Sequence, residues 1–505
     1  MYYLDFLLNR VTMYRLTLYY LIELLVIAGL FSIFGIISYS LVSIVISVAI
    51  LICVCAITNI IFSKVFQAPT NVESVYITAL ILACVITPLR NYHDLPMFFW
   101  AGILAMASKY VFARGNKHFF NPVAIALVMT SFGFGHSASW WMGNAAMMAF
   151  VLLGGLCIVR KTTREYMVAT FFGVSLLAIL GFSFMKGSNL LATINTTIFH
   201  SSYLFFVFIM LTEPLTTPPR RLLQMLYAGF IGLLFPPQFH IFSLYSTPEL
   251  ALVAGNVFSY LVSPKEKLVL KLSEKIQLAS DIADFVFKPQ KKFSYIPGQY
   301  VEWTFPHPHT DSRGNRRYFT LASSPTEDTL RIGVKFYDHG SSYKRALQEM
   351  KNTDVVMAGQ ISGDFLLPKN TAKKLVFVAG GIGITPFRSM IKYLLDTNEK
   401  RDIVMLFSNK VKEDIVYKDV FDQAEKIIGV KTFYNLTDLE QIPSDWSGKR
   451  GRISQEMIEE LVPDWRERVF YLSGPHGMVV GFEKTLGDLG VVKNKIKKDF
   501  FPGFV

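Results

Sequence analysis

Cysteine is scarce in this 505-residue chain, and its few cysteines are not spaced as metal ligands. The four are Cys53, Cys55, Cys84 and Cys157, all within apolar stretches, and no C-x-x-C pair occurs. Residues 264–505 contain no cysteine at all. This excludes a disulfide scaffold and, in that half, an iron–sulfur cluster held by four thiolates. We interpret the cysteines as small buried hydrophobic residues and predict no metal site.

Charged residues are also few, at 17 % of the sequence, whereas hydrophobic residues make up 52 %. The length predicts two or three domains. Long apolar stretches fill residues 15–263, whereas residues 264–505 have the composition of a soluble protein. The net charge of +12 does not indicate nucleic acid as a partner, because the basic residues lie beside apolar segments, where they orient a membrane protein. The expected partner of the first half is the lipid bilayer.

Apolar segments suited to membrane helices recur ten times in the first half. A bilayer core needs about 20 apolar residues per helix, and fewer where a helix is broken. The segments are 16–38, 41–63, 74–89, 95–112, 119–135, 144–159, 165–185, 199–215, 221–236 and 248–263. Basic residues crowd one set of loops, namely Arg10, Lys64, Arg114, Lys117, Arg160, Lys161, Arg164, Arg220, Arg221, Lys265 and Lys267; the other set holds Arg90 and Lys186. This asymmetry predicts a multi-pass cell-membrane protein with both termini and the second half in the cytoplasm.

The apolar half also contains an internal repeat. Pro88 and Pro122 are 34 residues apart, as are Pro214 and Pro248, and an Ala-Gly pair lies between the members of each pair. Five spans per half, an odd number, predict two halves of inverted orientation with broken helices around a central site. The alternative is that the prolines only start and stop helices.

Three carboxylates within or beside these segments are candidates for a site, namely Glu23, Glu213 and Glu249. Carboxylates are costly inside a membrane and tend to be functional there, so one interpretation is a site for a cation or a proton. The other is that Glu213 and Glu249 cap helix ends that water reaches.

Two strings in this half, SKYVFARGNKHFFNPVAIALVM (108–129) and FVFIMLTEPLTTPPRRLLQMLYAGFIGLLF (206–235), resemble the NqrB and RnfD membrane subunits of sodium-pumping NADH:quinone reductase and Rnf complexes. Glu213 stands where that family usually has Asp. The family's covalent FMN is bound by a threonine in an S/D-G-A-T-x-A-T segment, which this chain lacks. A second, non-covalent flavin (FMN or riboflavin) or a quinone is therefore the candidate carrier in the membrane half.

A haem-containing ferric reductase or oxidase is an alternative, because such proteins also join membrane spans to a flavin module. They need histidine pairs on facing helices. The histidines here are His93, His118, His136, His200 and His240, all at loop edges. Interfacial histidines are the better interpretation.

The second half changes pattern twice. Short alternating strands with regular turns, up to about Pro368, predict a small antiparallel barrel. From Lys373 onward strands and helices alternate, as in a doubly wound α/β domain. The predicted fold is therefore a membrane all-α domain (1–263), a β-barrel FAD-binding domain (264–369) and an α/β NAD(P)-binding domain (370–505).

The string Arg317-Tyr318-Phe319-Thr320 resembles the R-x-[YF]-[ST] flavin signature of ferredoxin-NADP reductase-type enzymes. The resemblance implies that the arginine pairs with the FAD pyrophosphate, that an aromatic ring packs on the isoalloxazine, and that the Thr320 hydroxyl reaches toward flavin N5.

Three further strings match later motifs of that family. They supply Gly340, Ser341 and Ser342 for a second diphosphate loop, Gly380, Gly381, Gly383, Thr385 and Pro386 for the nicotinamide dinucleotide, and Ser473, Gly474 and Pro475 beside the nicotinamide. The family often places a terminal aromatic over the flavin, for which Phe504 is the candidate; an unordered tail is the alternative. Thr320, Ser473 and Phe504 are the predicted catalytic residues.

The implied reaction is hydride transfer from NADH or NADPH to FAD, followed by single-electron release to an unknown acceptor. Ser408 and Lys410 follow the strand expected to face the adenosine ribose, and no carboxylate stands with them, which favours NADPH slightly. Three functions are open for the whole chain. The first is electron transfer into or across the membrane, the second is a redox-driven Na+ or H+ pump, and the third is a reductase that uses the spans only as an anchor.

Overall fold

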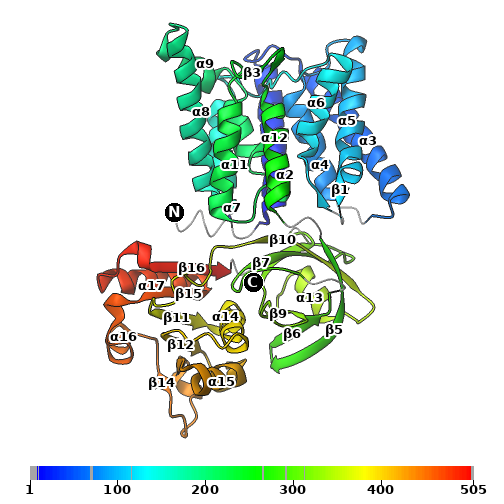
Figure 1. Ribbon diagram of the computed structural model, residues 1–505. Helices are drawn as coiled ribbons and strands as arrows, with labels where there is room; N and C mark the ends of the chain where they lie inside the picture. Colours follow the sequence, from blue (N-terminus) through cyan, green and yellow to red (C-terminus); the bar gives the residue numbers. More distant parts are fainter. Residues whose placement is uncertain are drawn as a thin grey trace. The chain divides into compact units, whose positions relative to one another are not determined.

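The computed structural model describes Leu8 and residues 11–68, 72–114, 117–263, 267–289, 293–311 and 313–501, so Phe504 lies outside the described residues. The chain divides into two compact units, Met1–Lys267 and Leu268–Val505. Figure 1 draws both units.

The first unit is helical. Its elements in chain order are α2 (Met13–Ile33), α3 (Leu41–Val65), α4 (Val72–Val85), η1 (Tyr92–Asp94), α5 (Leu95–Val111), β1 (Ala113–Arg114), β2 (Lys117–His118), α6 (Pro122–Phe134), α7 (Met148–Thr162), α8 (Glu165–Met185), α9 (Leu190–Phe199), α10 (Tyr203–Phe205), η2 (Phe206–Met210), η3 (Pro214–Thr216), α11 (Arg221–Leu234), β3 (His240–Ile241), β4 (Leu244–Tyr245) and α12 (Pro248–Val262). Polar side chains cap several helix starts: Ser40 accepts a hydrogen bond from Ser43 N, and Asn121 accepts one from Ala124 N.

Three described helices, α2, α3 and α8, are long and apolar enough to cross a membrane. A fourth span results if α9 and the helix Tyr203–Met210, bent by 57° at their junction, count as one. Each of the ten predicted segments contains a helix, but several helices are only 13 to 15 residues long. Ten full-length spans are therefore not shown. Helices α4 and α11 end shortly before Pro88 and Pro236, whereas α6 and α7 end at the left-handed residues Gly135 and Thr163. Helix α9 occupies a stretch in which no helix is predicted.

The proline pairs mark equivalent positions in the two halves. The first member of each pair follows the end of a helix. Pro88 follows α4, which ends at Val85, and Pro214 follows η2, which ends at Met210, and begins η3. The second members, Pro122 and Pro248, each open a helix. Before each of these two helices lies a two-stranded hairpin, β1–β2 or β3–β4, and His240 lies 127 residues after Ala113 at the same hairpin position. Figure 1 shows β1 and β3 at opposite ends of the helical unit.

The second unit begins with a six-stranded antiparallel sheet of order β8-β7-β10-β5-β6-β9. Its elements are β5 (Leu268–Ala279), β6 (Ile282–Phe287), β7 (Tyr300–Thr304), β8 (Arg316–Thr320), β9 (Leu330–Lys335), α13 (Ser342–Gln348) and β10 (Val355–Ser362). Ala322 N, just beyond β8, donates to Arg331 O in β9 at 2.9 Å, which joins the two ends of the sheet. Trp303, Phe285 and Phe287 fill its interior. We call this part the barrel lobe.

A parallel sheet of order β14-β13-β12-β11-β15-β16 forms the rest of the unit, which we call the α/β lobe. Its elements are β11 (Leu375–Gly380), η4 (Gly381–Ile384), α14 (Thr385–Asp396), β12 (Ile403–Asn409), η5 (Lys412–Asp414), α15 (Lys418–Ile428), β13 (Lys431–Leu436), η6 (Leu439–Gln441), β14 (Lys449–Arg450), α16 (Gln455–Leu461), η7 (Trp465–Glu467), β15 (Val469–Pro475), α17 (His476–Asp488), η8 (Lys493–Lys495) and β16 (Ile496–Phe501). Along β11, Phe377 packs into one core and Val376 and Val378 into another, because successive side chains of a strand point to opposite faces. Both faces of the sheet are therefore covered, as a doubly wound fold requires.

Candidate functional site

The flavin-signature strand is β8, and it ends at Thr320. The Arg317 side chain is buried, and its Nη1 donates to the carbonyls of Arg313 at 2.8 Å and Gly314 at 3.1 Å. Burial lowers the pKa of Arg317 to about 10, so the guanidinium is still charged near neutral pH. Phe319 packs against the barrel core beside Tyr343, whereas Tyr318 is more exposed and lies on the same face of the strand as Thr320.

The second diphosphate loop lies close to this arginine. The Arg317 Cζ atom is 5.1 Å from the centre of the Tyr343 ring, and Tyr343 belongs to α13, whose start is Gly340-Ser341-Ser342. The Ser341 hydroxyl caps the helix by accepting from Lys344 N, and Ser342 N donates to Asp311 Oδ2 at 2.8 Å. Burial acts to raise the pKa of Asp311, but its hydrogen bonds from Ser342 and Arg313 outweigh this, and the pKa is lowered. The structure thus brings together the two strings predicted to bind the FAD diphosphate.

The glycine loop leads from β11 through η4 into α14, as its sequence predicts. A Cβ atom at Gly383 would lie 2.5 Å from both Gly474 Cα and Ser473 O, and one at Gly380 would lie 2.1 Å from Met478 Sδ. Gly381 has a positive φ of 51°. Only glycine permits the loop to lie this close to the end of β15. The predicted dinucleotide loop and the Ser473-Gly474-Pro475 string are therefore in direct contact.

Thr320 and Ser473 both lie next to a carboxyl group that the sequence analysis missed. Asp499 lies beside Ser473 in the parallel pairing of β15 and β16, and the Thr320 hydroxyl donates to Asp499 Oδ2 at 3.4 Å. Burial raises the pKa of Asp499 to about 7, and the hydrogen bond from Thr320 only partly offsets that rise. Its one sequence signal is a lone acidic residue in the basic stretch KNKIKKDFF.

The Ser473 hydroxyl is the clearest sign of a ligand site here. Its side chain is fully buried, yet Oγ has no hydrogen-bond partner among the described residues. Buried polar groups nearly always have a partner, which a bound cofactor would supply. Together with the close-packed glycine loop, this unsatisfied hydroxyl fits the nicotinamide end of a dinucleotide.

Polar side chains also gather at the end of β12. The Asn435 amide lies 3.4 Å from Ser408 Oγ and donates to Gly451 O at 2.6 Å. Asn409 is buried, and neither end of its amide has a hydrogen-bond partner within the described part of the chain. Lys410 is exposed beside it. These groups fit the adenosine end, where Asn435 is a further residue that sequence reasoning missed.

In the helical unit, Glu213 lies between η2 and η3, where the backbone leaves the helix just before Pro214. Its carboxylate is 3.6 Å from His118 Nε2 and accepts from the Thr216 hydroxyl at 3.1 Å. Arg164 donates to the carbonyls of Thr212 and Glu213 that the break leaves free. The Glu213 side chain does not cap η3, which argues against the helix-capping interpretation for Glu213. Glu249 is buried in the first turn of α12, and Glu23 is exposed on α2.

Comparisons with known proteins concern the second unit. Residues 377–484 match the family described as Oxidoreductase NAD-binding domain. The chain is 26 % identical over 246 residues to Flavohemoprotein A of Dictyostelium discoideum (46 % of this chain, 59 % of that protein). It is 29 % identical over 247 residues to a flavohemoprotein of Bacillus cereus (45 % and 59 %). It is 26 % identical over 213 residues to the stachydrine N-demethylase reductase subunit Stc4 of Rhizobium meliloti (41 % and 59 %).

The chain thus spans about three fifths of the length of these relatives. Among solved structures, the flavohem-like FAD/NAD binding domain of a Vibrio cholerae nitric oxide dioxygenase matches with a TM-score of 0.41 and 23 % identity. That match covers 46 % of this chain and 98 % of that chain.

The matched family spans the α/β lobe from β11 into α17. The prediction of an NAD(P)H oxidoreductase module of the ferredoxin-reductase type is confirmed, and with it the cofactor pair FAD and NAD(P)H. The resemblance of the helical unit to NqrB and RnfD, the bilayer as partner and the roles of individual site residues stay predictions.

Proposed function

We propose that this chain is a membrane-bound oxidoreductase that passes electrons from NAD(P)H through FAD to an acceptor in or across the membrane. Residues 1–263 are the transmembrane domain, 264–369 the FAD-binding barrel and 370–505 the NAD(P)-binding domain, with both termini in the cytoplasm. The observation on which this depends is the meeting of Thr320, Asp499 and Ser473 at the close-packed glycine loop.

The chain's residues divide the work of holding two cofactors. Arg317 and the Gly340–Ser342 loop hold the FAD diphosphate, and Thr320 faces the reacting edge of the flavin. The loop Gly380–Pro386 and Ser473 hold the nicotinamide dinucleotide, and Ser408 and Lys410 face its ribose. FAD, when bound, accepts a hydride from NAD(P)H and gives up its electrons one at a time. The protein therefore orients and shields rather than acting as an acid or base.

Exposed apolar side chains support the membrane assignment of the first unit. Helix α3 exposes Val42, Val45, Ile57 and Ile61 on its surface, and α8 exposes Leu177 at 74 %. Water-soluble proteins rarely expose apolar areas of this extent, whereas a bilayer covers them. The name of Stc4, a reductase subunit, supports a module that delivers electrons to a separate acceptor.

The test starts with the flavin content of the detergent-purified chain, before and after acid precipitation, followed by anaerobic titration with NADH and with NADPH. We expect one FAD per chain, released by acid and bleached by either or both nucleotides. A second flavin would favour a carrier within the membrane unit, and an absence of flavin would refute the proposal. Liposomes that contain quinone in the bilayer or ferricyanide in the lumen then show whether electrons enter or cross the membrane.

A redox-driven Na+ or H+ pump is the second candidate. Its support is the pair of broken helices with hairpins at opposite ends of the unit, together with the Glu213–His118 contact at one break. Sealed vesicles supplied with NAD(P)H and with the acceptor that supports turnover, quinone or ferricyanide, would accumulate the cation, and Glu213→Gln would abolish uptake while leaving FAD reduction intact. Uptake that is unaffected by this change, or no uptake at all, would remove the pump from consideration.

A further inference from the structure

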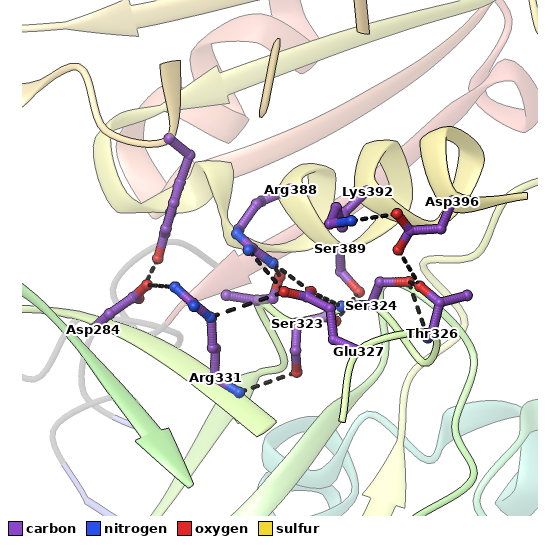
Figure 2. Close-up of polar contacts among 12 residues, drawn as sticks. Asp284, Ser323, Ser324, Thr326, Glu327, Arg331, Arg388, Ser389, Lys392 and Asp396 are labelled. Atoms are coloured by element: carbon purple, nitrogen blue, oxygen red, sulfur yellow. Dashed lines mark hydrogen bonds and ion pairs between the residues drawn. The ribbon is translucent and has the colours of Figure 1, made fainter. Parts of the chain in front are cut away.

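A buried ionic network joins the barrel lobe to the α/β lobe. Asp284 of β6 is fully buried and accepts hydrogen bonds from Arg331 Nη1 at 3.2 Å and from the Tyr417 hydroxyl. Glu327 pairs with both terminal nitrogens of Arg388, at 2.8 and 3.1 Å. Figure 2 shows that Arg331 lies between Asp284 and Glu327, and its Nε is 4.0 Å from Glu327 Oε1. We call these five residues the interlobe network.

The network is anchored next to both predicted cofactor-binding strings. Arg388 Nη1 donates to Ala322 O at 2.7 Å, and the Ser389 hydroxyl donates to Ser323 O at 2.5 Å. Ala322 and Ser323 are the second and third residues after Thr320, and Arg388 and Ser389 are the second and third after Pro386. Two adjacent hydrogen bonds therefore tie the continuation of the flavin strand to the helix that leaves the glycine loop.

Gly333 in β9 brings the same elements into direct contact. A Cβ atom there would lie 2.5 Å from the Tyr417 hydroxyl and 2.9 Å from Thr385 Cγ2. Tyr417 itself has a positive φ of 58°, which is rare for a bulky residue and persists only where its surroundings hold it in place. The glycine loop and Tyr417 thus rest on the barrel without an intervening side chain.

Stability alone does not account for such a network. Removing two charges from water costs about as much as their attraction returns, and apolar residues of similar size often stabilise a fold better. Arg388 and Glu327 nevertheless form a bidentate ion pair with two hydrogen bonds. Such a pair fixes the orientation of the two side chains relative to each other. Burial acts to raise the pKa of Glu327, but the bonds from Arg388 lower it overall, so the pair is charged.

We propose that the interlobe network is a positioning device: Arg388, held by Glu327, fixes the glycine loop against the flavin strand and thereby sets the rate of hydride transfer. This rests on the proposed function of the second unit as an FAD- and NAD(P)H-binding reductase. The residues of the network lie outside the strings predicted to contact the flavin and the nicotinamide. Their effect is therefore expected on the rate constant of transfer and not on nucleotide affinity.

The experiment compares the full-length FAD-loaded chain with Arg388→Met, Tyr417→Phe and the control Asp396→Asn. Asp396 accepts from Thr326 across the exposed edge of the same interface and pairs with Lys392, so its change removes a charge at this interlobe contact without touching the network. Anaerobic stopped-flow measurement of flavin bleaching at varied NAD(P)H gives the transfer rate constant and the dissociation constant separately. Amide hydrogen exchange of residues 321–324 and 385–394 reports the contact independently of activity.

We expect Arg388→Met to slow transfer by about tenfold or more, with Tyr417→Phe intermediate, because small displacements of reacting groups are costly to the rate. The dissociation constant should change less than threefold, both peptides should exchange faster, and Asp396→Asn should match the unmodified chain. If Arg388→Met does not fold, the transfer rate constant of Tyr417→Phe tests the proposal. Unchanged transfer in Tyr417→Phe, or a loss confined to affinity, would overturn the inference. An unmodified chain that NAD(P)H does not bleach would instead refute the proposed function.

Discussion

Asp499 is a carboxyl group that folding places in a partly buried position beside Thr320, and its effect on stability depends on pH. Its pKa is raised to about 7 by burial, whereas an unfolded Asp titrates near 3.8. Between these values the folded chain binds a proton that the unfolded chain does not, so the free energy of unfolding falls as pH rises from about 4 to about 7. Above pH 7 the folded chain carries the full free-energy cost of an ionised Asp499.

We therefore expect Asp499→Asn to stabilise the second unit at pH 8 by about 1–3 kcal/mol, since each pKa unit is worth about 1.4 kcal/mol before solvent screening. The gain should shrink as pH is lowered and be small near pH 4. Thermal unfolding of the full chain, followed by flavin release at several pH values, measures it. A stabilisation that is the same at every pH would contradict the assignment of a raised pKa.

Ser473 should separate stability from function. Because its buried hydroxyl has no partner in the described structure, Ser473→Ala should alter the free energy of unfolding by no more than about 1 kcal/mol. Hydride transfer should nevertheless slow about tenfold if the hydroxyl orients the nicotinamide. The two quantities come from thermal unfolding and stopped-flow bleaching of the same preparation. A large loss of stability with normal transfer would show that the hydroxyl is structural.

At the scale of elements, the glycine loop offers a matched pair of substitutions. Gly383→Ala would push a methyl group against Ser473 and Gly474, whereas Gly381→Ala meets no atom within 4 Å and is strained only by its positive φ. We expect Gly383→Ala to destabilise by about 3 kcal/mol and to abolish NAD(P)H binding. Gly381→Ala should cost about 1 kcal/mol. Titration calorimetry with NADP+ and thermal unfolding test both. Equal effects would mean that the close contact with β15 is unimportant.

The sequence predicted those elements that local patterns specify. Alternating apolar residues, turn residues and glycine spacing located β8, β11, the loop to α14 and β15, because each depends on neighbours in the chain. Asp499 and the Arg388–Glu327 pair were missed, since they come from strand order and from contacts between residues more than sixty positions apart. In the helical unit, hydropathy located ten apolar segments but not the π-helix η2, the bend before it or the helix α9. Hydropathy measures the solvent that a segment prefers, not where its backbone hydrogen bonds end.

At the scale of the whole molecule, the membrane topology is the feature that most needs measurement. The proposed ten-span topology would put the loop before α8 in the cytoplasm, and the loop after α8 and the β3–β4 hairpin outside. Thr163 and Ser188 are exposed at the two ends of α8, and Phe242 is 93 % exposed in the hairpin. Thr163 and Ser188 therefore report the two ends of α8, and Phe242 reports the β3–β4 hairpin, which is equivalent to the β1–β2 hairpin in the internal repeat.

We expect Ser188→Cys and Phe242→Cys, in a background whose four native cysteines are alanine, to react with a membrane-impermeant maleimide in intact cells. Thr163→Cys should react only after permeabilisation, because basic residues retain its loop on the inner side. Labelling of Ser188→Cys but not of Phe242→Cys would leave α8 as a span but contradict the inverted repeat. In an inverted repeat, an odd number of crossings separates the β1–β2 and β3–β4 hairpins, so the two hairpins lie on opposite sides of the membrane. Labelling of all three positions in intact cells would contradict the proposed topology as a whole and leave the reductase module without an established side of the membrane.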